Sequence, residues 1–194
     1  RTEQFLNLGS TDVTPDHWLG LAKRINQIFR DDPDAAGVAV THGTATLEET
    51  AYFLNLTVKD SRPVVVTGAM RPPTGLGTDS DVNLIDSIRV AAAPQSAGRG
   101  VLTILNNQIQ AARDVTKTNS YRLETFRSHD FGLLGYADAD GQVVSPARAT
   151  VFHNGVLVQH ASELTGPTAH KKRPPYEAHG EKLPISLQDH SNPT

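Results

Sequence analysis

The sequence of 194 residues contains no cysteine, and it has only one methionine and one tryptophan. The lack of cysteine excludes a disulfide scaffold, a thiol nucleophile and a cysteine-based zinc site. No apolar run approaches the ~20 residues that a membrane-spanning helix needs. Basic residues are not in excess, because the net charge is -3. We therefore expect neither nucleic acid nor an anionic membrane surface as a partner.

The composition changes near residue 150 and divides the chain into two parts. We expect residues 1–150 to form one α/β domain and residues 151–194 to diverge from it. The second part holds five of the eight histidines and five of the twelve prolines. Within it, only 151–152 and 156–158 have strand character. From about Thr165 onward we expect a poorly ordered tail.

Residues 1–150 alternate between strand and helix patterns. Short continuous apolar runs, typical of strands covered on both faces, lie at 37–41, 63–67 and 101–105. Helical spacing of apolar residues predicts helices over 15–30, 47–54 and 83–93. Strands separated by single helices predict a mostly parallel sheet with helices on both faces, the three-layer arrangement of Rossmann-like and flavodoxin-like folds.

The sequence predicts where the second of these helices begins and which residues of the third face the core. Thr46 and Glu49 have the spacing of a capping box, which predicts that the second helix begins after Thr46. In the third helix, the apolar positions predict that Leu84, Ile88 and Val90 face the core.

Ligands of such sheets bind beyond the carboxyl ends of the strands, which directs attention to residues 41–46, 68–81 and 106–118. The first of these segments combines three threonines with a glycine at a helix N-terminus, a combination suited to a carboxylate or an oxyanion. The alternative is structural. Thr46 is then only an N-cap, the other threonines are turn residues, and His42 is a buried, hydrogen-bonded side chain.

The segment 110–119 places Lys117 among threonines. A neutral lysine amine next to a hydroxyl group can take its proton and activate its oxygen. The alternative is a solvated loop in which Asn119 or Ser120 caps a helix through residues 123–126.

Taken together, these segments resemble the bacterial-type L-asparaginases, the asparaginase/glutaminase family. The similar motifs are Thr-His-Gly-Thr at 41–44, Leu-Glu-Glu-Thr-Ala at 47–51, Gly-Ala-Met-Arg-Pro at 68–72 and Arg-Asp-Val-Thr-Lys-Thr at 113–118. A Gly-Ser pair at 9–10 precedes the first helix, as it does in the family. The resemblance covers roughly residues 4–150, and its motifs occur in the family's order and at its intervals.

The resemblance implies hydrolysis of L-asparagine, with L-glutamine as a second substrate, by threonine chemistry without a metal or an organic cofactor. It also implies homotetramers built from close dimers. Thr44 corresponds to the second catalytic threonine and Lys117 to its lysine partner. Ser10 corresponds to the serine that holds the substrate carboxylate. Thr11 and Ala45 occupy two further substrate-binding positions.

The sequence departs from the family pattern in three respects. The family has aspartate at the position of Ala45, where it receives the substrate's α-ammonium group, and commonly glutamine at the position of Thr11. The sequence also contains no Thr-Gly-Gly-Thr, the family's nucleophile segment. The resemblance implies that this segment and the first strand precede Arg1, and that the smaller carboxyl-terminal domain is absent.

Two hypotheses of different class remain. The first is an amidohydrolase whose sequence here is an internal piece. The second is a non-catalytic relative that keeps the fold as an amino-acid-binding or interaction domain. A Rossmann-type nucleotide binder is less favoured, because no Gly-x-Gly-x-x-Gly opens a helix. The compartment stays open between periplasmic or secreted and cytoplasmic, with the former favoured.

Overall fold

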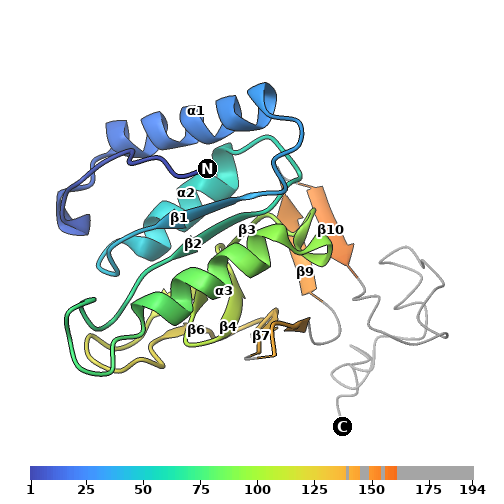
Figure 1. Cartoon of the computed structure of the whole chain (residues 1–194). Coiled ribbons are helices and arrows are strands. Elements are labelled where there is room, and N and C mark those ends of the chain that lie inside the picture. Colours follow the sequence, from blue (N-terminus) through green and yellow to red (C-terminus); the bar gives the residue numbers. More distant parts are fainter. Residues whose placement is uncertain (139, 145–148, 154–155, 161–194) are drawn as a thin grey trace, which may run out of the picture. The chain divides into compact units, whose positions relative to one another are not determined.

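The computed structural model describes residues 1–138, 140–144, 149–153 and 156–160. Its centre is a six-stranded sheet with the order β1-β2-β3-β4-β7-β8 (Figure 1). The strands are β1 (Val38–Thr41), β2 (Val64–Thr67), β3 (Val101–Leu105), β4 (Gln108–Ala111), β7 (Gly135–Ala137) and β8 (Val143–Val144). The predicted strands at 37–41, 63–67 and 101–105 are β1, β2 and β3.

Three helices accompany the sheet: α1 (Pro15–Asp31), α2 (Leu47–Thr57) and α3 (Ser80–Ala92). β1, β2 and β3 pair in parallel, with α2 and α3 as the connections between them. The α/β class and the parallel βαβ units are therefore confirmed. β4, β7 and β8 extend the sheet through antiparallel pairings.

Alternate side chains of the buried strands build two cores on opposite faces of the sheet. Val64 and Val66 pack in one core with Leu54 of α2, and α1 lies outside α2 on this side. Val65 belongs to the other core, together with Val90 of α3. The helices of Figure 1 accordingly lie on both sides of the sheet, as the sequence predicts.

The orientation of α3 differs from the prediction. Val90 is buried as expected, but Leu84 and Ile88 are exposed. The face toward the sheet instead carries buried polar residues, among them Asn83 and Asp86. These side chains hold the β3–β4 turn: the backbone N–H of Asn106 donates to Asn83 Oδ1 at 3.0 Å, and Asp86 accepts from the next side chain, Asn107, at 2.8 Å. These partly buried backbone and amide groups of the turn need hydrogen-bond partners, and the polar face of α3 supplies them.

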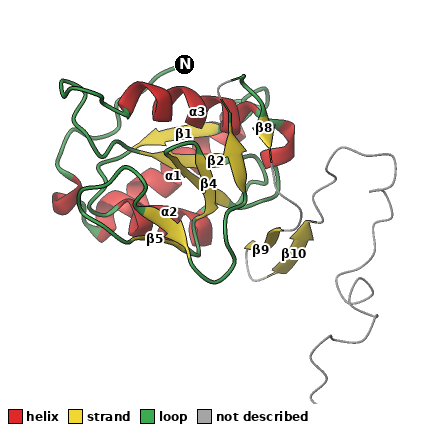
Figure 2. Cartoon of the chain, turned by 90° about the horizontal axis from the view of Figure 1, so that it is seen from below, coloured by secondary structure: helices red, strands yellow, loops and turns green. Residues whose placement is uncertain are grey.

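Residues 106–128 contain more strand than the sequence suggests. Asn106 and Asn107 both have positive φ, as in a tight hairpin turn, and lead from β3 into β4. β5 (Val115–Lys117) then pairs with β6 (Phe126–Ser128) in a separate antiparallel ribbon. The alternative of a helix through 123–126 was therefore wrong. Figure 2 shows β5 beside α2.

The remaining elements are short. η1 (Ser10–Asp12) precedes α1, and η2 (Pro94–Ser96) follows α3. β9 (Ala149–His153) pairs with β10 (Val156–His160), at the positions predicted to be strands. The tail expected from Thr165 lies outside the described residues. No helix within the described residues is long and apolar enough to cross a membrane.

Candidate active site

Thr44 and Lys117 meet at the carboxyl edge of the parallel strands. Thr44 lies in the turn between β1 and α2, and Lys117 is the last residue of β5. The Nζ atom of Lys117 donates to Oγ1 of Thr44 at 2.9 Å, and the contact is partly buried. Two residues that are 73 positions apart in the sequence thus form one amine–hydroxyl pair.

Glu48, in the first turn of α2, holds the strand that carries this amine. Its carboxylate accepts the backbone N–H of Lys117 and the hydroxyl of Thr116, the latter at 3.4 Å. This role of Glu48 is not visible in the sequence, because an acidic residue in a first helical turn is ordinary. Its partner becomes visible only when β5 lies beside α2.

Ser10 packs against the same turn. Its Oγ atom accepts the backbone N–H of Ala45 at 3.2 Å, and its carbonyl accepts the Thr46 hydroxyl at 2.6 Å. A Cβ atom at Gly43 would lie 2.6 Å from Ser10 Oγ, so glycine is required for this close approach. The predicted capping box was wrong, because the Thr46 side chain bonds Ser10 instead of capping α2.

His42 has a structural role in this turn. Nδ1 lies 2.7 Å from the Gly43 carbonyl, which can only accept, so Nδ1 carries the proton. In the neutral ring, Nε2 is then the acceptor for the buried Thr50 hydroxyl at 3.0 Å. Thr50 in turn accepts the indole N–H of Trp18 at 2.7 Å. The interpretation of His42 as a hydrogen-bonded structural residue fits this network, although its ring is only partly buried.

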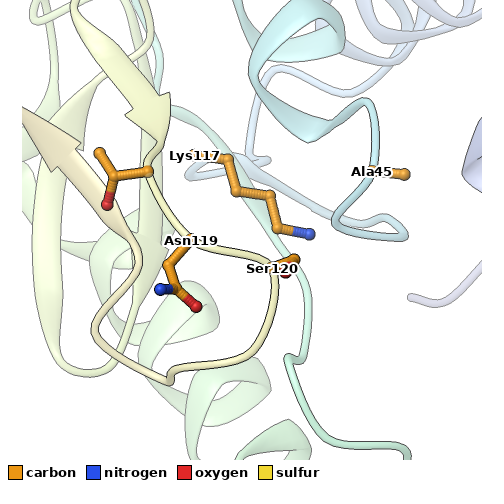
Figure 3. A pocket seen from close by; sticks show the side chains of 5 residues that line it. Ala45, Lys117, Asn119 and Ser120 are labelled. Carbon is orange, nitrogen blue, oxygen red and sulfur yellow. The ribbon is translucent and has the colours of Figure 1, made fainter.

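An open hollow of about 260 Å³ lies beside the pair. Ala45, Lys117 and the loop residues 118–120 line it. Figure 3 shows the Lys117 amine directed toward the turn that carries Ala45. The lining contains one cation and no carboxylate, a balance that favours an anionic group of a ligand. Thr11 is exposed and is not among the lining residues.

Comparison with known proteins identifies the family. The sequence model described as "Asparaginase, N-terminal" matches residues 1–150. The chain belongs to the asparaginase family. It is 51% identical over 133 residues to "L-asparaginase 2" of Bacillus subtilis and 49% identical over 134 residues to "Probable L-asparaginase periplasmic" of Haemophilus influenzae. Each match covers 69% of this chain, and 35% and 38% of the two relatives.

A solved asparaginase structure confirms the fold. The "Probable Cytoplasmic L-asparaginase from Campylobacter jejuni" matches with a TM-score of 0.74 and 41% identity, over 79% of this chain and 48% of that one. The chain therefore spans about a third to a half of the length of these asparaginases. The name of the Haemophilus influenzae relative says periplasmic, and that of the Campylobacter jejuni structure says cytoplasmic. Both compartments were considered from the sequence.

Proposed function

We propose that this chain supplies the threonine–lysine part of an L-asparagine amidohydrolase, which converts L-asparagine and water to L-aspartate and ammonia. The observation that carries the proposal is the 2.9 Å contact between Lys117 Nζ and Thr44 Oγ1 at the carboxyl edge of the sheet. The names of the relatives support the substrate, with L-glutamine as a second candidate.

In this proposal Lys117 is the base for the Thr44 hydroxyl. The amine accepts a proton only in its neutral form, across the contact that it makes in the structure. Loss of this proton makes Oγ1 of Thr44 a nucleophile toward the amide carbon, or a proton acceptor for a second threonine hydroxyl. Ser10, which already accepts a backbone N–H in this turn, and Thr11 contribute to binding the substrate carboxylate.

A second candidate function is an asparaginase-like domain that binds an amino acid without hydrolysing it. Ala45 is the specific observation that favours this alternative. Its side chain is a methyl group beside the hollow, where the family resemblance implies a carboxylate for the substrate's ammonium group. A site without that carboxylate holds the ammonium group less firmly.

A chimera tests the proposal. The matched segment of Bacillus subtilis L-asparaginase 2 is replaced by the corresponding residues of this chain, so that the relative supplies the flanking segments. Ammonia release from L-asparagine and from L-glutamine is then measured, together with L-aspartate binding by calorimetry. Release well above the substrate blank supports the amidohydrolase. Binding without release supports the non-catalytic alternative.

We also propose that the protein forms a homo-oligomer, as the family resemblance implies. The outer face of α3 supports this proposal because four large apolar side chains are 40–54% exposed on it: Val82, Leu84, Ile85 and Ile88. Contiguous apolar surface of this kind marks association sites. Sedimentation velocity of the protein, compared with an Ile85→Glu variant, tests the proposal.

A further inference from the structure

Lys117 is held at two points by one short stretch of chain. Its Nζ atom bonds Thr44, and its backbone N–H donates to the carboxylate of Glu48, four residues farther along. Thr44 therefore binds the amine of Lys117, and Glu48 binds the backbone of the same residue. Without the Glu48 contact, the backbone of Lys117 is no longer fixed relative to the turn that carries Thr44.

The backbone contact is made at an unpaired strand edge. The N–H of Thr118 points toward the β6 side, where it donates to the Thr125 carbonyl at 2.8 Å. The N–H of Lys117 points to the opposite edge, where no strand pairs with β5 within the described residues. Glu48 accepts it there, and a carboxylate acceptor makes this a charge-assisted bond of the stronger kind.

We propose that Glu48 is a positioning residue, which holds the backbone of β5 at Lys117 so that the amine reaches Thr44. The importance of this position for catalysis rests on the proposed function. Within the described residues, Glu48 is the only carboxylate that bonds either member of the pair. A small displacement of a catalytic group lowers a reaction rate substantially, so the holding contact matters as much as the amine itself.

The chain offers a matched control. Glu49 lies in the same first turn of α2, carries the same charge and is exposed. Its side chain makes none of the hydrogen bonds or ion pairs found among the described residues. Glu48→Ala and Glu49→Ala therefore remove the same charge and the same atoms from adjacent positions, but only the first removes the contact with β5.

The experiment measures Lys117 directly in the 194-residue chain. Amide hydrogen exchange followed by NMR reports the backbone contact, and the rate of trinitrophenylation, read by mass spectrometry, reports the amine. In Glu48→Ala, exchange at Lys117 is expected to rise about ten- to a hundredfold, the effect of losing a bond to a charged acceptor. Labelling of Lys117 is expected to rise about fivefold relative to Lys59, since its amine loses a fixed partner.

Glu48→Gln keeps an oxygen acceptor, so its exchange and labelling rates at Lys117 are expected to lie between those of Glu48→Ala and the unmodified chain. Amide exchange at the core strand β2 reports whether each variant is folded. Glu48→Gln provides a milder variant if Glu48→Ala does not fold. Unchanged exchange and labelling at Lys117 in Glu48→Ala, or equal increases in Glu49→Ala, would overturn the proposal.

An activity measurement separates this proposal from the proposed function. In the chimera, Glu48→Ala is expected to lower kcat with little change in KM, because the substrate contacts remain. If Lys117 loosens in Glu48→Ala while kcat is unchanged, Glu48 holds Lys117 but the pair is not catalytic. If Lys117 does not loosen, the role of Glu48 fails whatever the activity of the chimera.

Discussion

Lys117 Nζ lies 2.9 Å from Thr44 Oγ1, although the two residues come from different sheets of the fold. Thr44 follows a strand of the central sheet, and Lys117 ends a strand of the β5–β6 ribbon. The contact exists because β5 lies beside α2, whose first turn follows Thr44 directly.

The isolated chain of 194 residues is expected to release no more ammonia from L-asparagine than its Lys117→Ala variant. The family resemblance assigns a nucleophile to a Thr-Gly-Gly-Thr segment, and this sequence contains none. Groups that act together in catalysis lose most of the rate when one is missing. A coupled ammonia assay decides the point. Turnover clearly above that of the variant would show that Thr44 suffices as the nucleophile.

Ala45→Asp is expected to increase kcat/KM of the chimera for L-asparagine. A carboxylate beside the hollow gains a charge-assisted hydrogen bond to the substrate ammonium group, worth about 1.5–3 kcal/mol, or roughly ten- to a hundredfold. Ala45→Asn is the matched control, because it adds the same volume without the charge. Equal kinetics for all three proteins would mean that another group already holds the ammonium.

The contribution of Asp60 to stability is expected to disappear in acid. Hydrogen bonds from the Arg62 side chain hold the pKa of Asp60 below its usual value. A carboxylate with a lowered folded-state pKa stabilises the fold above its unfolded pKa and loses this effect as the pH falls. The difference in unfolding free energy between the unmodified protein and Asp60→Asn should therefore be constant above about pH 5 and shrink below about pH 4. Urea unfolding at several pH values measures it. A difference that stays constant down to pH 2.5 would contradict this origin.

The burial of Val90 and the exposure of Ile88 on α3 make a prediction for stability. Val90→Ala is expected to lower the unfolding free energy by about 2 kcal/mol, because two buried methyl groups are lost and a cavity remains. Ile88→Ala removes more atoms but is expected to cost less than about 1 kcal/mol, since Ile88 is 54% exposed. Urea unfolding of both variants tests the order. A larger loss for Ile88→Ala would place that side chain in a packed environment.

The sequence was most informative for strands whose side chains are all buried. Continuous apolar runs predicted β1, β2 and β3. β2 and β3 are buried at every position, as strands covered on both faces require. β1 lies at the edge of the sheet and is only partly buried, which differs from the expectation. The orientation of α3 was not predictable in this way. Asn83 and Asp86 face inward because they satisfy the turn at Asn106 and Asn107, and those partners are set by tertiary structure.

The candidate site was identified by resemblance rather than by spacing. On spacing alone, turns and caps were the better explanation for the threonines of the β1–α2 turn and for the segment of Lys117. The ribbon that carries Lys117 has only three residues in each strand, too few for a clear alternating pattern. Glu48 lies within the Leu-Glu-Glu-Thr-Ala motif. Its role had no sequence signal, because it depends on a backbone N–H of a strand far away in the chain.

The most direct test of the central claim is the effect of Lys117→Ala on kcat/KM of the chimera for L-asparagine. Lys59→Ala, which removes an exposed lysine just beyond the C-cap of α2, is the control. If Lys117 is the base for Thr44, its loss is expected to lower kcat/KM by about a hundredfold or more, while Lys59→Ala changes it little. A Lys117→Ala chimera as active as the Lys59→Ala control would contradict the assignment.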